Sequence, residues 1–236
     1  MESHRLFDPS ISSVIVSYAR LHTYVCTPED TDETFQDTFR FGSLRSLHCS
    51  HNTHLTDNTL IALSSSLRTL DCGFNGKFTD AGLQALQTLT TLHCGFNGNF
   101  TDAGLQALHN LTTLYCGWDT NFTDAGLQAL RNLTTLDCGW DENKFTDVGL
   151  QALQNLTTLH CGFNGKFTNA GLQALRNLTT LYCGWNTNFT DAGLQVLQNL
   201  TTLHYGWNIN FTHIGLQALR KLIWLNGAAY VNGDKK

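Results

Sequence analysis

Leucines and other apolar residues recur along most of this chain with a period of 22 or 23 residues. The unit is clearest in residues 89–110, LTTLHCGFNGNFTDAGLQALHN, and close copies of it begin at Leu67, Leu111, Leu133, Leu156, Leu178 and Leu200. A unit this short cannot bury its apolar face alone, so the copies are expected to stack and share a continuous core. The pattern therefore predicts a solenoid, with the remaining residues at its two ends.

Each unit contains the signals of one strand and one short helix. In residues 89–110 the positions expected to be buried are Leu89, Leu92, Cys94, Phe100, Leu105 and Leu108. The strand alternates, so His93 between two buried positions faces outward. Asn97 is expected to hydrogen-bond the turns above and below it, and Thr101 and Asp102 supply an N-cap for the helix. With parallel stacking of the strands, this predicts a curved α/β solenoid with short helices.

The chain is expected to be one elongated domain with distinct ends. Residues 1–20 are predicted to contain an N-terminal capping helix, which begins at Asp8 and Pro9. Residues 21–43 are a degenerate first repeat, residues 44–221 hold eight full repeats, and residues 222–236 form a terminal half repeat. The chain is thus predicted to be a solenoid over residues 21–236, covered at its amino-terminal end.

The carboxyl-terminal end is expected to differ, because the last strand is not followed by a full repeat with a helix. An open parallel edge there is a template for another chain, and the residues near it are Trp224, Leu225, Tyr230 and Val231. A two-fold pairing would close without forming fibres, so we predict a homodimer through this edge. The alternative is that residues 228–231 fold back and cover the last core layer.

The consensus LxxLxCxxNxxFTDxGLxxLxx resembles a leucine-rich repeat, and its TDxGL step is similar to the cysteine-containing subfamily found beside F-boxes. The resemblance extends over about residues 21–227. It implies a horseshoe with a concave parallel sheet and short convex helices, whose concave face binds other proteins. The 22-residue period and the position of the cysteine within the strand depart from that subfamily.

Composition narrows the classes of partner. The formal net charge is −5, and the 14 Lys and Arg residues form no basic stripe, so no nucleic-acid partner is expected. No stretch approaches the roughly 18 apolar residues of a membrane span, so no membrane contact is expected. The first residues do not resemble a secretory signal, which favours a cytoplasmic, intracellular location.

The cysteines follow the repeat, one in each, at Cys26, Cys49, Cys72, Cys94, Cys116, Cys138, Cys161 and Cys183. Each stands at a core position, where it is expected to act as a small buried hydrophobe. On adjacent parallel strands such side chains point the same way about 4.8 Å apart, which is poor geometry for a disulfide. The sequence therefore predicts free thiols in a reducing compartment, with no zinc site and no cofactor.

The central outward position of each strand varies while the rest of the repeat stays fixed. We predict that these residues bind the partner: His48, Asp71, His93, Tyr115, Asp137, His160, Tyr182 and His204. Asp, His and Tyr recur in this order together with their flanking residues, which indicates duplication of a segment of about 67 residues. Duplication alone can also produce this order, without selection on the face.

Two Asp–His pairs in this column are candidates for chemistry. Asp71 beside His93, and Asp137 beside His160, are expected to lie close enough to raise the histidine pKa. Neither pair has a nucleophile next to it, so enzyme activity is not expected. A His/Asp metal site is geometrically conceivable but is not favoured.

An aromatic residue, preceded by glycine, lies two residues beyond most cysteines or their equivalents, at Phe74, Phe96, Trp118, Trp140, Phe163, Trp185 and Trp207. Tryptophan is frequent in binding hot spots. The four tryptophans of this row are therefore also predicted to bind the partner: Trp118, Trp140, Trp185 and Trp207. The other interpretation is that the row packs along the lip of the core and compensates for the small cysteines. We favour partial burial, because seven exposed rings in line are an aggregation hazard.

These observations predict a non-enzymatic scaffold that binds a protein partner on its concave face. One alternative is an F-box-like substrate adaptor of a ubiquitin ligase, with the amino-terminal helix as a remnant F-box, although residues 1–20 hold fewer helices than an F-box. Another alternative is a carbohydrate-binding module that uses the aromatic row. Nine N-x-[ST] sequons arise from the NFT and NLT steps of the repeat and are interpreted as its by-products.

Overall fold

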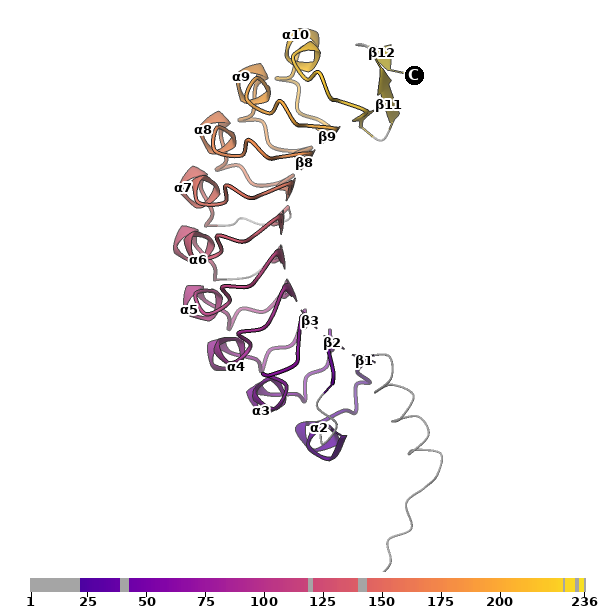
Figure 1. The fold of residues 1–236 in the computed structure, drawn as a ribbon, viewed down its shortest axis with the longest axis vertical. Helices are drawn as coiled ribbons and strands as arrows, with labels where there is room; N and C mark the ends of the chain where they lie inside the picture. The colour runs from indigo at the N-terminus through magenta and orange to yellow at the C-terminus, as the bar shows by residue number, and fades with distance from the viewer. Residues whose placement is uncertain are drawn as a thin grey trace, which may run out of the picture.

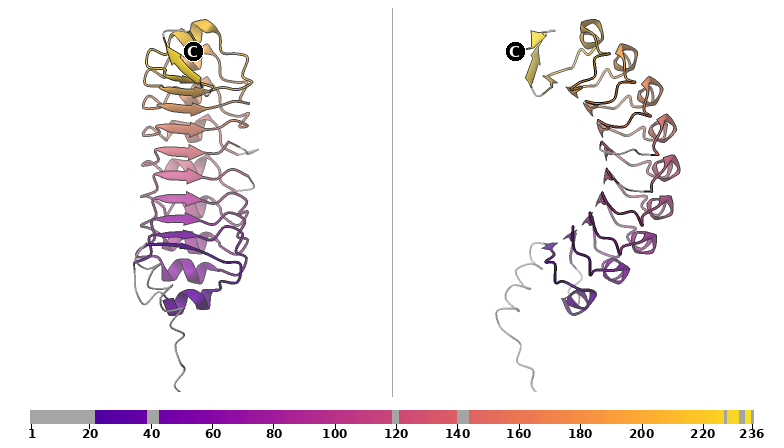
Figure 2. Two further views of the ribbon diagram at one scale, coloured as in Figure 1. Left: turned by 90° about the vertical axis from the view of Figure 1, so that its right-hand side faces the viewer. Right: turned by 180° about the vertical axis from the view of Figure 1, so that it is seen from behind.

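The computed structural model describes residues 22–38, 43–118, 121–139, 144–226, 228–231 and 234–235. These residues form an open arc in which short strands line the inner side and short helices line the outer side (Figure 1). Turned by 90°, the inner side is a ladder of strands stacked along the arc (Figure 2). The predicted α/β solenoid with a concave parallel sheet is confirmed. The capping helix predicted in residues 1–20 lies outside the described residues.

The concave sheet contains ten parallel strands in chain order. They are β1 (Thr23–Val25), β2 (Ser46–His48), β3 (Thr69–Asp71), β4 (Thr91–His93), β5 (Thr113–Tyr115), β6 (Thr135–Asp137), β7 (Thr158–His160), β8 (Thr180–Tyr182), β9 (Thr202–His204) and β10 (Trp224–Leu225). Neighbouring repeats pair in register, so that Leu92 lies between Leu70 and Leu114. Because side chains alternate along a strand, the middle leucine faces the core and the two residues beside it face outward.

The convex side carries short helices, each in the second half of a repeat. They are α2 (Asp32–Thr38), α3 (Asp57–Ala62), α4 (Asp80–Ala85), α5 (Asp102–Leu105), α6 (Asp124–Ala129), α7 (Asp147–Gln151), α8 (Asn169–Leu172), α9 (Asp191–Leu194) and α10 (His213–Gln217). Thr101 caps α5 as predicted, since its hydroxyl accepts the backbone N–H of Ala103 at 3.3 Å. In the described part of the chain, every helix is too short or too polar to cross a bilayer.

The core is a single stack of leucine, phenylalanine and cysteine layers. Phe100 and its equivalents in five other repeats have no exposed surface: Phe78, Phe122, Phe145, Phe167 and Phe189. Leu55 replaces this phenylalanine in the diverged repeat and is also fully buried. Seven cysteines are buried, as the repeat pattern predicts, whereas Cys26 in the first repeat is only partly covered.

Side-chain amides connect the repeats in three ladders. The buried Asn97 donates its Nδ2–H to the backbone carbonyl of Asn75 in the preceding repeat at 2.7 Å, as predicted, and accepts the N–H of Asn99 within its own turn. The other two ladders run along the sides of the solenoid and are made by the nine asparagines of the N-x-[ST] sequons. Each donates Nδ2–H to a carbonyl of the preceding repeat, at 2.5 to 3.0 Å: Asn99, Asn110, Asn121, Asn132, Asn155, Asn177, Asn188, Asn199 and Asn210. These asparagines therefore join repeats together.

The convex side has a further ladder, which was not predicted from the sequence. Asp80, the first residue of α4, accepts both the N–H and the hydroxyl of Thr101 in the next repeat, at 2.8 and 2.5 Å. Equivalent pairs recur along the arc, and in one of them Asn169 replaces the aspartate and donates to the hydroxyl of Thr190. The first residue of each of these helices therefore also joins its repeat to the next one.

The carboxyl-terminal edge differs from the prediction. β11 (Ala228–Val231) pairs antiparallel with β10, and β12 (Asp234–Lys235) pairs antiparallel with β11. These two strands turn back beside the end of the arc, labelled β11 and β12 in Figure 1. The prediction of a free parallel edge at β10 is therefore wrong, because β11 of the same chain pairs with that strand. The predicted homodimer loses the edge on which it was based.

Candidate functional site

The predicted partner-binding column lies on the concave face. His48, Asp71, His93, Tyr115, Asp137, His160, Tyr182 and His204 occupy the last position of consecutive strands β2 to β9 and are paired in register. Each is partly exposed, whereas the leucine before it is buried. The column is thus continuous across the face.

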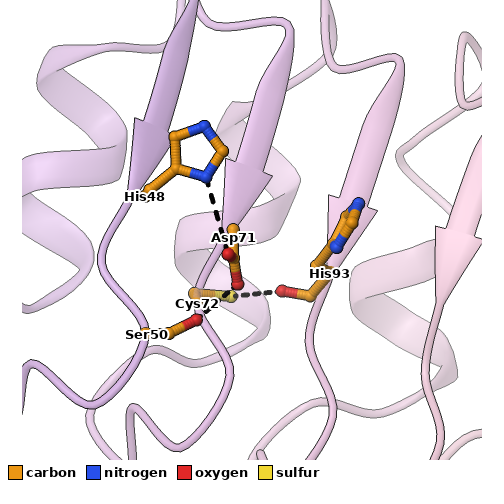
Figure 3. A network of polar contacts seen from close by, with 5 residues as sticks. All are labelled: His48, Ser50, Asp71, Cys72 and His93. Carbon is orange, nitrogen blue, oxygen red and sulfur yellow. Dashed lines mark hydrogen bonds and ion pairs between the residues drawn. The ribbon is translucent and has the colours of Figure 1, made fainter. Parts of the chain in front are cut away.

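The amino-terminal part of the column is organised by Asp71, as Figure 3 shows. His48 Nδ1 lies 3.5 Å from Asp71 Oδ2, and the hydroxyl of Ser50 donates to Asp71 Oδ1. Asp71 and His93 are cross-strand neighbours, as predicted, but the carboxylate contacts His48 and Ser50 of the preceding repeat. Burial lowers the pKa of His93 and outweighs the opposing effect of the Asp71 charge. The predicted rise in the pKa of His93 is therefore wrong.

The equivalent pair in the carboxyl-terminal part of the column forms as predicted. His160 Nδ1 lies 3.1 Å from Asp137 Oδ2, and the backbone N–H of Gly139 donates to Asp137 Oδ1 at 3.1 Å. The His160 ring also contacts Tyr182, whose ring stacks on His204 with centroids 4.2 Å apart. Burial lowers the pKa of His204, and the nearby His160 acts in the same direction.

The aromatic row forms a second column beside the first, and its described rings are partly buried, as predicted, with Trp207 the most exposed. The exposed fraction of its described members runs from 39% at Phe96 to 72% at Trp207. The rings stack on one another: Phe74 has His51 on one side at 4.3 Å and Phe96 on the other at 4.1 Å. Ring-to-ring contact covers part of the row, and its packing along the lip of the core stays a prediction. Trp140 lies outside the described residues.

The two columns enclose two shallow grooves, with the glycines that precede the aromatic residues as their floor. The first, the N-terminal groove, has a volume of about 290 Å³ and is lined by Ser50, His51, Asp71, Gly73, Phe74, His93, Gly95, Phe96, Tyr115, Gly117, Trp118 and Asp137. The second, the C-terminal groove, has a volume of about 580 Å³ and is lined by Asp137, Gly139, His160, Gly162, Phe163, Tyr182, Gly184, Trp185, His204, Gly206, Trp207 and Asn226. Asp137 belongs to both grooves. The grooves were not predicted from the sequence, although the glycine repeated before each aromatic residue was their signal.

The backbone hydrogen bonds of the groove floor point in opposite directions along the arc in the two halves. In the N-terminal half the N–H of each aromatic position points to the following repeat, as from Phe74 to the carbonyl of Gly95. In the C-terminal half it points to the preceding repeat, as from Trp185 to the carbonyl of Gly162. The first arrangement needs a positive φ, which is 61° at Phe74 and 60° at Phe96. Since this region disfavours residues other than glycine, the N-terminal floor carries more backbone strain.

The thiols of the central repeats are not exposed to the grooves. The cysteines of the central repeats are enclosed by the core, and burial raises the pKa of the Cys94 and Cys183 thiols, so thiolates do not form there. Within the described ranges, no group of three or more His, Cys, Asp or Glu side chains is placed to hold a metal ion. The grooves present hydroxyl, imidazole and carboxylate groups beside aromatic rings.

Parallel inner strands, outer helices and one shared core define the class of repeat proteins that bury apolar surface only between neighbouring units. Residues 63–87 and 85–108 match the family described as Leucine Rich repeat. The matched repeats, their copies along the chain and the fold make this a leucine-rich-repeat protein. The likeness to the cysteine-containing subfamily stays a prediction. No curated protein matches the sequence.

Solved structures share the fold at low sequence identity. An internalin from Listeria monocytogenes has a TM-score of 0.61 and 24% identity, covering 80% of this chain and 56% of that chain. A leucine-rich-repeat protein from Leptospira interrogans has a TM-score of 0.64 and 17% identity, covering 87% of this chain and 55% of that chain. The yeast Rad7–Elc1 complex gives a TM-score of 0.53 and 18% identity, covering 80% of this chain and 63% of that chain. The chain spans little more than half of the first two proteins, and the likeness concerns the fold.

Proposed function

We propose that the chain is a non-enzymatic scaffold that binds a protein partner on its concave face. The observation that carries the proposal is the contrast between a fixed frame and a varied column. The buried leucine of strands β2 to β9 is constant, while the outward residue after it changes among His, Asp and Tyr. A face of this kind presents different chemistry at each step on a rigid support, which suits recognition of another protein.

The exposed rings support the same function. Trp118, Trp185 and Trp207 are 46%, 53% and 72% exposed, and large aromatic side chains of this kind commonly anchor protein interfaces. One of the solved structures that share this fold is a complex of two proteins, Rad7 with Elc1. No nucleic-acid partner is proposed, since no Lys or Arg lines either groove in the described part of the chain.

The two alternatives have less support. Sugar rings bind aromatic side chains by stacking on their faces, but Phe96 has Phe74 on one side and Trp118 on the other, and Trp185 is placed in the same way. The F-box alternative depends on residues 1–20, which lie outside the described residues. We therefore propose neither.

Site-specific photocrosslinking tests the concave face. A photoreactive amino acid is placed at Thr113 in β5 or at Gln128 in α6, in the same part of the arc but on opposite sides. With protein from the native source added, crosslinks to a defined polypeptide are expected at Thr113 and not at Gln128. Crosslinking at Gln128 alone would show that the partner binds the convex side.

We also propose an intracellular, reducing location, because the packing of the core requires its seven buried cysteines to remain free thiols, and a reducing compartment keeps them so. Thiol titration of the native protein is expected to label Cys26 first, since it is the least covered, and the others only on unfolding. Rapid labelling of several thiols in the native protein would contradict this prediction. So would the absence of reactive thiols after unfolding without reductant, because the cysteines would then be oxidised.

A further inference from the structure

The two grooves are copies of one site. The N-terminal groove has Asp71, His93 and Tyr115 on one wall, and the C-terminal groove has Asp137, His160 and Tyr182 at the equivalent positions. The opposite walls also correspond, with a phenylalanine followed by a tryptophan in each. The order of residues that suggested a duplication thus builds the same combination of groups twice on one face.

Both grooves have an accessible carboxylate and, among their described lining residues, no Lys or Arg. Asp71 lines the N-terminal groove, and Asp137 stands at the equivalent position of the C-terminal groove and lines both grooves. The side chains of Asp71 and Asp137 are 30% and 27% exposed, so a ligand can reach them. Each carboxylate has a histidine and one further donor as its described partners, Ser50 for Asp71 and Gly139 for Asp137. A carboxylate has about four acceptor positions, so both retain capacity for another donor. Among the described residues that line the two grooves there is no Lys or Arg to neutralise them.

We propose that the grooves are paired subsites for an extended peptide segment with basic side chains, Arg or Lys, at positions i and i+4. This inference rests on the proposed function and specifies the chemistry of the partner. One basic side chain contacts Asp71 and the other contacts Asp137, while the segment runs along the arc over the glycine floor. Charge complementarity selects the basic groups, and the distance between the carboxylates selects their spacing.

The spacing follows from the register of the sheet. Asp71 ends β3 and Asp137 ends β6, three strand steps away. At about 4.8 Å for each step, the two positions are about 14 Å apart. Four residues of extended chain span about 13.5 Å, and residues i and i+4 project from the same side. Basic residues at i and i+3 would cover about 10 Å and project to opposite sides, so only one of them could reach a carboxylate.

Fluorescence anisotropy with synthetic peptides tests the spacing. The probe has two arginines at i and i+4 in a neutral Ser, Thr and Gly background, and the matched control has the same arginines at i and i+3. We expect the i,i+4 peptide to bind at least about tenfold more tightly, although both peptides carry equal charge. Equal binding of the two, or no measurable binding of the i,i+4 peptide, would overturn the inference.

Variants of the protein test the assignment of the carboxylates. Asp71→Asn and Asp137→Asn keep the size of the side chain and remove its charge, and each is expected to weaken binding of the i,i+4 peptide about tenfold. Glu29→Gln, an exposed change outside both grooves, is the control for net charge and should bind as the unaltered protein does. Circular dichroism verifies that all three remain folded. Unchanged binding in both aspartate variants would overturn the inference.

These results are distinguishable from failure of the proposed function. If a polypeptide crosslinks at Thr113 but the i,i+4 peptide does not bind, the concave scaffold stands and the basic-peptide inference fails. If crosslinks form only at Gln128, the proposed function itself fails.

Discussion

Burial, more than charge, sets the protonation of His93 at the centre of the N-terminal groove. Its ring lies between strands that carry Asp71 and Tyr115 and contacts the tyrosine ring with centroids 4.1 Å apart. Loss of solvation lowers its pKa, His48 acts in the same direction, and the charges of Asp71 and Asp137 oppose this without reversing it. The neutral imidazole is thus the form that the folded groove favours.

This has a consequence for stability as a function of pH. The pKa of His93 is lower in the folded chain than the roughly 6.5 expected after unfolding, so between these values the unfolded chain binds more protons. The contribution of His93 to the free energy of unfolding is therefore complete above about pH 6.5 and is lost as the pH falls through the folded-state pKa. In urea unfolding at pH 7.5 and 5.5, His93→Gln is expected to lose less stability on acidification than the unaltered protein. An NMR titration that places the pKa of His93 above 6.5 would contradict this.

At the scale of one element, the glycine in each convex helix from α4 to α10 is required by the helix of the preceding repeat. A Cβ atom on Gly104 in α5 would lie 2.6 Å from Asp80 Oδ1 and 2.9 Å from Leu83 Cδ1. Asp80 cannot move away freely, because Thr101 donates two hydrogen bonds to it. The close approach of one helix to the next therefore depends on the absence of a side chain here.

Gly104→Ala is accordingly expected to destabilise the protein by about 1 to 2 kcal/mol, as overpacking does, although alanine favours a helix more than glycine does. Gly165→Ala is the matched control, because nothing lies within 4 Å of its added methyl group. That variant is expected to stay within about 0.5 kcal/mol of the unaltered protein or to gain slightly. Urea unfolding measures both. A Gly104→Ala variant more stable than Gly165→Ala would show that α4 and α5 can separate at no cost.

The elements could be predicted from the sequence because their signals are local and recur in every unit. The buried Phe100, the bonding of Asn97 and the cap at Thr101 each follow from spacing within 22 residues. Contacts between units were harder to predict. Asp71 has a histidine on both neighbouring strands, and register alone does not decide which one it pairs with. The exposure of the aromatic row depends likewise on ring-to-ring stacking between repeats, which no single unit contains.

At the scale of the whole molecule, the carboxyl-terminal hairpin ends the parallel sheet. β11 and β12 turn the last pairing antiparallel, so β10 does not present a free edge. The core beneath is slightly more open than in the middle of the arc, with Phe211 and Leu216 both 8% exposed where equivalent residues have no exposed surface. This end of the solenoid is thus covered by the chain itself.

Removal of residues 227–236 is expected to convert this end into the open edge that solenoids normally cover. Light scattering over a hundredfold range of concentration should then show a mass that rises with concentration, with a smaller or no rise for the complete chain. Trp224, which is 49% exposed in β10, offers a control, since a polar residue there should reduce association of the shortened chain. A constant mass of one chain after truncation would show that β11 and β12 do not serve as the cover.

The regular stacking of the whole arc also makes the distance between the two grooves adjustable in steps of one repeat. A second copy of residues 89–110 inserted after Asn110 adds one strand between β4 and β5, so Asp71 and Asp137 become four steps apart, about 19 Å. Six residues of extended chain span about 20 Å and again project both ends to the same side. The preferred peptide is therefore expected to change from arginines at i and i+4 to arginines at i and i+6.

A matched insertion separates this effect from a general effect of lengthening the chain. A second copy of residues 178–199 placed after Asn199 adds one repeat of equal length, carries no aspartate on the concave column, and leaves Asp71 and Asp137 three steps apart. This variant should keep the preference for i and i+4 in the same anisotropy measurement. Because both insertions add one strand and the same curvature, a change of preference in the first alone would assign the spacing to the two carboxylates. The same change of preference in both variants would mean that the spacing of the two arginines is selected by residues other than Asp71 and Asp137.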